Sequence, residues 1–299
     1  MKYISSKLIE SDIILSLVRD TRRDFPRMGA VKMLHYIRPK MEKMSIDIGR
    51  DAFIALLSDN SMLVRRKRSK CRTTFSQHRF YKYPNLIRDI TPVRPNQIWV
   101  SDITYMPVGD GFIYLSLITD AYSRKIVGWN LARDLATGNA LKALRMALST
   151  LPAGSELIHH SDRGIQYCSL AYVRALDAFN IRISMTESGD PLENAIAERV
   201  NGILKTEWLD GQHFASWSDA VSYVNRIIGL YNEERPHQSL DYKTPALVHD
   251  TAVPVERRWK NYYPQRLPKS EIMPDGAFDV PCQAISEQGL KTTETVKPG

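Results

Sequence analysis

The sequence is poor in cysteine. Its 299 residues include three cysteines, Cys71, Cys168 and Cys282, which lie far apart and form no C-x-x-C pair. An odd and scattered set predicts neither a disulfide framework nor a thiolate zinc site. Small disulfide-stapled folds and zinc modules built on paired cysteines are therefore excluded.

Long apolar runs are also missing. No stretch approaches the roughly 18 uninterrupted apolar residues of a membrane helix. Glu10 and Asp12 interrupt the first segment before the apolar block of a secretory signal forms. Hydrophobic residues make up 43% of the chain and charged residues 25%, ordinary values that exclude wholesale disorder. We therefore expect a cytoplasmic protein of about two domains with no membrane partner.

The positive charge is concentrated at one end of the chain. The formal net charge is +8 and the isoelectric point is about 9.3. Residues 1–90 contain 20 Lys and Arg against 9 Asp and Glu, whereas residues 91–299 contain 21 against 24. This asymmetry indicates a basic nucleic-acid-binding module joined to a body with another task.

Residues 1–62 have the outline of a helix-turn-helix domain. Apolar spacing predicts helices over about 6–24, 30–37 and 50–57, with the second ending before Pro39. Two helices joined by a short turn that contains glycine are typical of DNA-binding modules. Small helical hairpins without that function share the same outline.

A basic linker, residues 63–94, follows the predicted helices. A dense run of cations lowers its own repulsion and releases counterions when it lies on phosphates, so it predicts contact with DNA. A solvated linker is the alternative. The cations expected to contact DNA are Arg65, Arg66, Lys67, Arg68, Lys70 and Arg72.

After Pro95 the composition becomes that of an α/β domain, which we place at residues 95–250. Stretches rich in β-branched and aromatic residues predict a three-stranded antiparallel meander at 98–107, 112–119 and 125–129. The pattern continues with a helix at 140–148, a strand at 156–160, a helix at 170–179, a strand at 181–185, and helices at 191–209 and 217–231. This order predicts a mixed five-stranded sheet flanked by helices. Residues 251–299 have little hydrophobic pattern, and we expect an extended, disordered tail.

Three acidic residues stand out in the predicted α/β domain. Asp102 interrupts a strand whose neighbours on both sides are apolar, where a carboxylate needs a partner. Asp162 closes a strand at the end where open α/β sheets place their sites, although an Asp at a turn or a helix cap is common. Glu198 heads a polar stripe on the helix at 191–209, and a lone glutamate of this kind is commonly only solvated.

The three carboxylates together predict a metal site. If the sheet brings them to one edge, they supply the hard oxygen ligands that favour Mg²⁺ or Mn²⁺. Two such ions about 4 Å apart activate a water or a 3′-hydroxyl and stabilise the leaving oxygen of a phosphodiester. We therefore predict phosphoryl transfer by in-line attack, with Asp102, Asp162 and Glu198 as catalytic residues and as ligands of two Mg²⁺ (or Mn²⁺) ions.

At these residues the sequence resembles the OrfB-type DDE transposases of bacterial insertion sequences, whose catalytic core is similar to that of retroviral integrases. Asp162 and Glu198 are separated by 35 residues, the spacing for which that family is known. The resemblance extends over about residues 25–250. Its motifs are WVSDIT at 99–104, HSDRGIQY at 160–167, ENAIAE at 193–198, LKTE at 204–207, YN at 231–232 and RPH at 235–237.

The resemblance implies an RNase H-like core that binds metal through Asp102, Asp162 and Glu198, preceded by a helix-turn-helix domain. It implies a transposase that cuts DNA at the ends of an insertion sequence and joins the 3′-hydroxyl to another phosphodiester. The implied partners are terminal inverted repeats, target DNA, further copies of the chain on DNA, and an upstream OrfA-type protein or fusion. The implied location is the bacterial nucleoid. Glu193 stands where that family more often has Asp, and we do not assign it to catalysis.

Helix geometry places Asn194 and Lys205 within about 40° of Glu198, and we expect both to contact DNA. His160 lies near a strand end, where a hydrogen-bonded structural role is expected. The segment 235–237 is compatible with a turn or with a DNA contact, and the sequence does not decide between them. Two other functions remain open: a catalytically inactive transposase-derived DNA-binding protein, and a hydrolytic nuclease that uses the same metal centre.

Overall fold

The structure is a computed structural model that describes residues 2–64, 79–108, 111–187 and 191–254. The basic run at 65–72 lies outside the described residues, as does nearly all of the predicted tail at 251–299, so both predictions stay predictions. Within these ranges, no helix combines the length and the apolar character needed to cross a membrane.

Three helices form the amino-terminal part of the chain: α1 (Lys2–Asp24), α2 (Ala30–Glu42) and α3 (Arg50–Asp59). They pack around fully buried apolar side chains that include Val18, Ile37 and Phe53. The three predicted helices are therefore confirmed. Their use as a DNA-binding module stays a prediction.

Helix α2 continues past the residue at which the sequence predicted its end. Pro39 lies inside the helix, which runs on to Glu42. A proline in a helix removes one backbone hydrogen bond and crowds the preceding turn. Ile37 and Met41 flank Pro39 and are almost completely buried. The burial of these two side chains offsets the cost of the proline and keeps the last turn helical.

The centre of the chain is a mixed sheet of five strands in the order β3-β2-β1-β4-β5. Strand β1 pairs antiparallel with β2 and parallel with β4, β2 pairs antiparallel with β3, and β4 pairs parallel with β5. The predicted meander and the mixed five-stranded sheet are both confirmed. The strands are β1 (Ile98–Val108), β2 (Gly111–Asp120), β3 (Ile126–Ala132), β4 (Ile158–Ser161) and β5 (Arg182–Met185).

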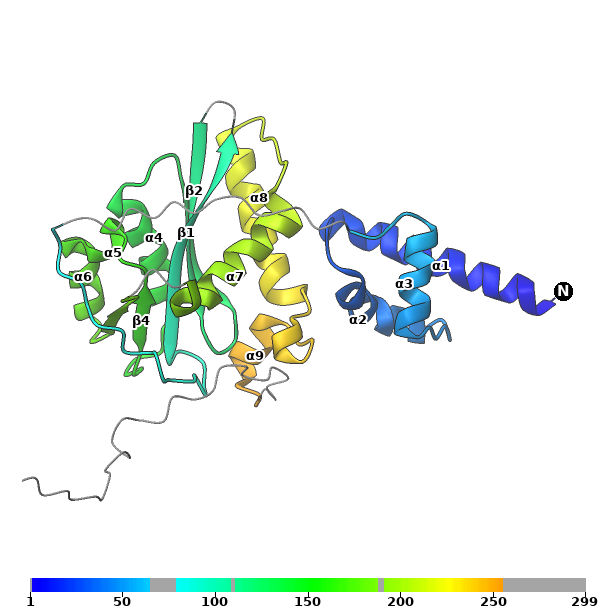
Figure 1. The fold of residues 1–299 in the computed structure, drawn as a ribbon, viewed down its shortest axis with the longest axis horizontal. Helices are drawn as coiled ribbons and strands as arrows, with labels where there is room; N and C mark the ends of the chain where they lie inside the picture. Colours follow the sequence, from blue (N-terminus) through cyan, green and yellow to red (C-terminus); the bar gives the residue numbers. More distant parts are fainter. Residues whose placement is uncertain (1, 65–78, 109–110, 188–190, 255–299) are drawn as a thin grey trace, which may run out of the picture. The chain divides into compact units, whose positions relative to one another are not determined.

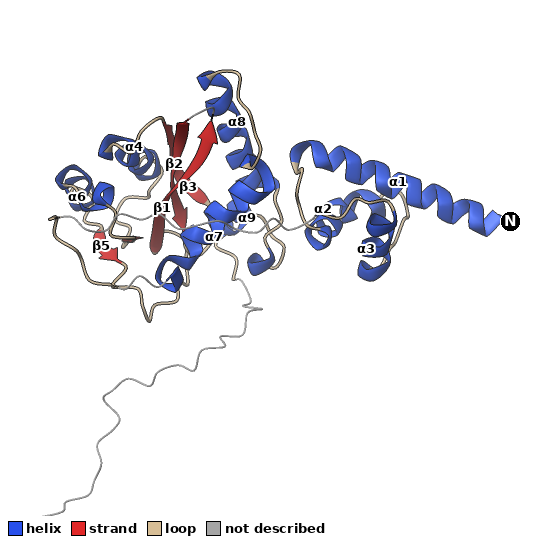
Figure 2. Ribbon diagram, turned by 45° about the horizontal axis from the view of Figure 1, so that its top comes forward, coloured by secondary structure: helices blue, strands red, loops and turns tan. Residues whose placement is uncertain are grey.

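Helices cover both faces of the sheet. One face carries α4 (Thr137–Leu148), α5 (Ile165–Cys168) and α6 (Leu170–Asp177), as Figure 1 shows. Helices α7 (Ala195–Leu204), α8 (Trp217–Gly229) and α9 (Pro245–Thr251) lie on the other side (Figure 2). Each face buries an apolar cluster, with Trp99 and Leu144 on the first and Leu115, Val200 and Ile227 on the second. The sheet is thus covered on both sides, and its functional groups gather at its edge.

The helix predicted at 191–209 is three segments. A 3-10 turn, η1 (Pro191–Asn194), precedes α7, and a π-helical turn, η2 (Lys205–Leu209), follows it. The angle of 100° per residue therefore applies within α7 and does not extend to its neighbours on either side. A second π-helical turn, η3 (Leu230–Glu234), extends α8 in the same way.

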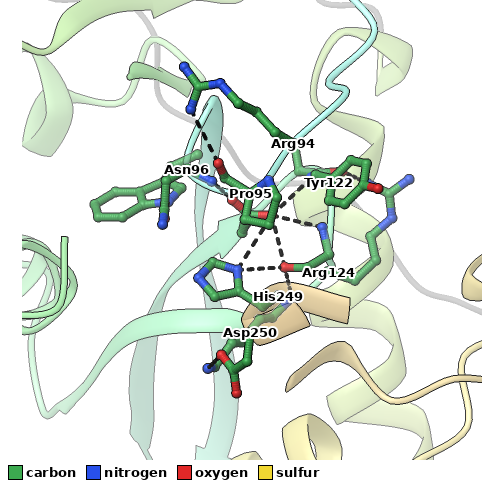
Figure 3. A network of polar contacts seen from close by, with 12 residues as sticks. Arg94, Pro95, Asn96, Tyr122, Arg124, His249 and Asp250 are labelled. Atoms are coloured by element: carbon green, nitrogen blue, oxygen red, sulfur yellow. Dashed lines mark hydrogen bonds and ion pairs between the residues drawn. The ribbon is translucent and has the colours of Figure 1, made fainter. Parts of the chain in front are cut away.

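The turn between β2 and β3 is locked to α9 by a buried carboxylate (Figure 3). Asp120 is fully buried and accepts hydrogen bonds from the backbone amides of Asn96 (2.7 Å) and Ser123 (2.7 Å) and from the Ser123 hydroxyl (2.8 Å). His249 of α9 lies 2.9 Å from the same hydroxyl through Nδ1. These contacts join the start of β1, the β2–β3 turn and α9, so they support the sheet away from the predicted carboxylate site.

Replacement of Gly128 by alanine should destabilise the protein, because β3 and α4 touch at this glycine. A Cβ there would be closer than van der Waals contact to the Ala143 carbonyl oxygen and 2.9 Å from Cβ of Ala147. Overpacking of this kind costs about 1–3 kcal/mol. We expect Gly128→Ala to lower the free energy of unfolding by this amount in urea denaturation. The matched control is Gly138→Ala, where a Cβ meets nothing within 4 Å, and equal stability of the two variants would contradict the prediction.

Candidate active site

Asp102 and Asp162 come together because β1 is longer than its parallel neighbour β4. The pairing of the two strands ends at Ser101 with Ser161. Each aspartate directly follows one of these two serines. Adjacent strands lie about 4.8 Å apart, which makes the two carboxylates neighbours at the edge of the sheet. The burial of successive residues in β1 shows which side chain faces the site. Ser101 is fully buried, whereas Asp102 is half-buried and opens to the edge.

The position of Asp162 is fixed by the turn that follows β4. Its Oδ1 accepts a hydrogen bond of 3.0 Å from the backbone amide of Gly164. A Cβ on Gly164 would lie 2.9 Å from the same oxygen, so a larger residue here would push against the carboxylate. Asp162 is therefore a turn aspartate, as the more common interpretation of its sequence position predicts. The turn uses Oδ1 of this carboxylate.

Asp102 is held by two hydrogen bonds and surrounded by negative charge. Its Oδ2 accepts from Asn201 Nδ2 at 2.7 Å, and its Oδ1 accepts from the backbone amide of Ile103 at 2.9 Å. Burial, helped by the charges of Asp162 and Glu198, raises its pKa to about 7 against the lowering effect of the two hydrogen bonds. A cation that binds to such a carboxylate would stabilise its charged form.

Glu198 enters the site from α7. The helix packs on the sheet through Ala197, Val200 and Ile203, all buried, while Glu198 is exposed. Its charge raises the pKa of Asp102, so the two carboxylates are close enough to interact. The sequence did not single out Asn201, although it follows Glu198 by three residues on the same polar stripe, and this i, i+3 spacing was the available signal.

The residues at this edge fit a divalent cation in charge and in ligand chemistry. Among the residues that the structure describes, no three His, Cys, Asp or Glu side chains already converge on one point where an ion would bind. Burial and the charges of Asp162 and Glu198 raise the pKa of Asp102, and a bound cation would offset these effects. Carboxylate oxygens are the ligands that Mg²⁺ and Mn²⁺ prefer. Asp102, Asp162 and Glu198 are the residues that would hold it.

The variant Asp102→Asn should be more stable than the wild type at about pH 8 without metal. Because the pKa of Asp102 rises from 3.8 to about 7 on folding, the stability that its protonated form contributes is complete below about pH 4 and is lost as the pH rises through 7. At pH 8 the wild type holds a charge that asparagine lacks, a difference on the order of 1 kcal/mol after solvent screening. Scanning calorimetry at about pH 5 and pH 8, with and without Mg²⁺, measures the effect.

We expect Mg²⁺ to raise the melting temperature of the wild type and to leave that of Asp102→Asn nearly unchanged. The control is Asp134→Asn, which changes an exposed aspartate at the start of α4. Equal stabilisation of wild type and Asp102→Asn by Mg²⁺ would remove Asp102 from the ligand set.

The two histidines of β4 are structural. His159 Nε2 lies 2.7 Å from the Ser101 hydroxyl and 3.0 Å from the Tyr172 hydroxyl, and His160 Nδ1 lies 2.8 Å from the Ser184 hydroxyl. Burial lowers the pKa of His159 to about 3 and that of His160 to about 4, so both rings are neutral at pH 7. The structural role predicted for His160 is confirmed.

Asn194 and Lys205 do not share the exposed face of α7. Asn194 is buried, and its Nδ2 donates a 3.0 Å hydrogen bond to the Ser101 carbonyl oxygen, which ties the start of α7 to β1. Asn194 does not follow the predicted angle because the residue lies in η1, before the α-helix begins. Lys205 is half-buried in η2, with Nζ 4.5 Å from the centre of the Tyr105 ring. The geometry gives Asn194 a positioning role, and DNA contact stays a prediction for both residues.

The motifs after α7 form a buried ion pair. Arg235 Nε and Nη2 donate to Glu207 Oε2 and Oε1 at 2.8 and 2.7 Å, and Lys32 Nζ donates to Oε1 at 2.9 Å. Burial raises the pKa of Glu207, but Arg235 and Lys32 outweigh it and hold the pKa below its usual value. In the same region the Asn232 amide exchanges two 2.9 Å hydrogen bonds with the backbone of Ile126 in β3. The sequence left open whether Arg235 belongs to a turn or contacts DNA. In the structure, this residue makes a structural contact.

Comparisons with known proteins agree with this fold. Two family models, both described as integrase core domain, match residues 92–191 and 179–245. The chain is 34% identical to the insertion element IS600 uncharacterized 31 kDa protein of Shigella sonnei, over 72% of this chain and 79% of that protein. It is 33% identical to the transposase for insertion sequence element IS629 of Shigella sonnei, over 59% of this chain and 60% of that protein.

Two further similarities cover smaller parts of this chain. The chain is 37% identical to transposase InsF for insertion sequence IS3A of Escherichia coli K12, over 51% of this chain and 53% of that protein. The HTLV-2 integrase catalytic core domain, whose structure was solved in complex with magnesium, aligns with a TM-score of 0.42 and 20% identity over 52% of this chain and 97% of that domain. The match thus spans little more than half the length of some curated relatives.

The sheet order, the helices on both faces and the two family matches define an RNase H-like catalytic core of the integrase type. The identity to the IS600 protein extends this assignment beyond the core, since it covers most of that protein. The chain belongs to the insertion-element transposases that carry an integrase core domain.

Proposed function

We propose that this chain catalyses Mg²⁺-dependent cleavage and strand transfer of DNA at the ends of an insertion sequence, with Asp102, Asp162 and Glu198 as catalytic residues. The observation that carries the proposal is the carboxylate of Asp102, which lies at the sheet edge beside two further acidic groups that raise its pKa. Carboxylates whose pKa is raised by burial and by neighbouring acidic groups are concentrated at functional sites, which supports the proposal.

The neighbouring groups keep the ligands in place. Asn201 orients Oδ2 of Asp102, the amide of Gly164 orients Oδ1 of Asp162, and Asn194 ties the start of the Glu198 helix to β1. Two bound Mg²⁺ (or Mn²⁺) ions would activate a water or a 3′-hydroxyl and neutralise charge that develops on the phosphate. The protein contributes the orientation of both reacting groups.

In this proposal, segments that precede the catalytic core also bind DNA. Helices α1–α3 (domain 1–62) supply a helix-turn-helix module, and the linker 63–94 supplies phosphate contacts ahead of the core at 95–250. The substrates are terminal inverted repeats and target DNA. Because two ends must be joined, several copies of the chain act together, with or without an upstream OrfA-type partner. Such a protein would act at the bacterial nucleoid.

A product assay tests the proposal against its two alternatives. The protein is incubated with Mg²⁺ and labelled DNA that carries the terminal repeat of its own element, and the products are separated by size. Joined DNA supports strand transfer. Cleaved DNA without joining identifies a hydrolytic nuclease, because the carboxylates do not distinguish water from a 3′-hydroxyl. A bound complex without either product identifies an inactive DNA-binding protein.

Lys205→Glu should weaken strand transfer more than it weakens metal binding. Lys205 lies close to the site, beside Tyr105, and a cation there attracts the DNA backbone, whereas a glutamate repels it. We expect transfer activity to fall about 10-fold or more, from the loss of a charge-assisted phosphate contact. The Mg²⁺-induced shift in melting temperature should change little. Lys142→Glu, an exposed lysine on α4, is the matched control, and unchanged transfer by Lys205→Glu would contradict the proposed contact.

A further inference from the structure

A hollow of about 380 Å³ opens beside the two aspartates. Asp102 and Asp162 line it, together with Gly164 of the turn after β4 and Gln166 of α5. It exists because β1 continues beyond Ser101, where its pairing with β4 stops, so this stretch of β1 has an open edge on that side. The size falls within the range of pockets that hold small ligands.

The remaining wall of the hollow is aromatic and apolar. Tyr105 and Phe112 meet edge to face, with their ring centres 5.4 Å apart. Phe112, Leu135 and Ile165 are large apolar side chains that stay 52%, 46% and 41% exposed. Tyr114 completes the wall, paired across the strands with Tyr105. Exposed apolar side chains that gather next to carboxylates indicate a surface made for a ligand with a flat apolar face.

The charge around the hollow favours an occupant that carries a phosphate. Lys205 Nζ lies 4.5 Å from the Tyr105 ring centre, which places a cation beside the aromatic wall. The carboxylates that line the hollow are the groups that hold metal in the proposed function. A nucleotide has both parts that this surface addresses, because its base and its phosphate are linked through one sugar. Aromatic side chains stack on any base, since every base has a π-face.

We propose that this hollow receives an unpaired base of the DNA strand next to the reacting phosphodiester, stacked on Phe112 and bounded by Tyr105 and Tyr114. This inference rests on the proposed function, because the phosphate of that nucleotide must lie at Asp102 and Asp162. Phe112 is the stacking residue, since its ring is more than half exposed. The Gln166 carboxamide donates to the Leu135 carbonyl oxygen at 3.0 Å and thereby holds the rim in place. The DNA end is therefore opened locally when it binds.

Binding of forked DNA tests the inference without requiring catalysis. Two terminal-repeat duplexes are compared, one fully paired and one with unpaired bases at the cleavage site, in Ca²⁺ to hold the DNA uncut. We expect the wild type to bind the forked duplex more tightly, and Phe112→Ala to lose that preference by about 10-fold, the effect of removing one stacking aromatic. Phe112→Trp should keep the preference. Placing 5-iodouracil at the unpaired position should give photocross-links to Tyr105, Phe112 or Tyr114.

The matched control is Phe179→Ala, which removes a phenylalanine that is 51% exposed and does not line the hollow. Equal preference for forked DNA in Phe112→Ala and wild type, or cross-links that map elsewhere, would overturn the inference while normal joined products leave the proposed function standing. A change in oligomeric state of DNA-free Phe112→Ala, with the preference for forked DNA intact, would assign the hollow to a protein interface instead. Absence of any product from the wild type would count against the proposed function alone.

Discussion

Asp162→Asn should abolish both cleavage and joining while leaving the fold intact. Asparagine keeps an oxygen that accepts from the Gly164 amide, so the turn after β4 is preserved, and the negative charge is lost. We expect activity to fall at least about 10³-fold, which corresponds to about 4 kcal/mol of transition-state stabilisation. Glu198→Gln should have an effect of similar size, since Glu198 is exposed and its replacement disturbs no packing. Product formation with Mg²⁺ is measured for each variant.

Two further variants calibrate this result. Glu193→Gln alters the carboxylate that accepts from the Glu187 amide at 2.6 Å, outside the proposed ligand set, and should leave activity within about threefold of the wild type. Asn201→Ala removes the hydrogen bond to Asp102, and we expect a loss of about 10–100-fold. If Glu193→Gln were as damaging as Asp162→Asn, the assignment of the three ligands would be wrong.

Arg235→Ala should cost about 3–5 kcal/mol of folding free energy, the largest stability effect that we expect for a single substitution. The side chain is 1% exposed and makes both hydrogen bonds of a bidentate pair with Glu207, which is itself buried. Removing it leaves the ion pair of Glu207 with Lys32. The desolvation of that carboxylate is then only partly compensated. Denaturation in guanidinium chloride measures the change.

An exposed ion pair in the same region is the matched control. Arg226 pairs with Asp24, and both side chains are largely exposed. Arg226→Ala should cost no more than about 1 kcal/mol, because solvent screens the pair. The double variant Arg235→Met with Glu207→Gln should recover part of the loss, since it removes the uncompensated charge. A loss of less than about 1 kcal/mol in Arg235→Ala would contradict a structural role for this pair.

Local pattern was sufficient to predict the helices and strands where burial is one-sided or complete. The β-branched run at 98–107 became β1 and the spacing at 217–231 became α8, because each pattern has a single period that suits its element. The prediction failed at 191–209. The apolar spacing there continues through three different backbone conformations, and a period alone does not separate an α-helix from the 3-10 and π turns at its ends.

The residues of the candidate site also fall into two groups, those that the sequence predicts and those that it does not. Asp102 and Asp162 could be singled out, since a carboxylate within an apolar strand needs a partner and open α/β sheets place their sites at strand ends. Asn201 and Glu207 could not, because each lies on an ordinary helical position and acquires its partner from a distant segment. Arg235 illustrates the point most clearly, since its sequence neighbourhood resembles an exposed turn and its side chain is buried.

The residues and their order are enough to predict the class of the fold, the acidic residues with their spacing, and the concentration of positive charge in residues 1–90. These properties are carried by composition, period and order along the chain, which are local. Three further features emerge from the folded chain: β1 continues past its neighbour β4, Asn201 holds Asp102, and Phe112 stays exposed beside the carboxylates. Each of these depends on strand register and on segments far apart in the chain, and register is set by packing.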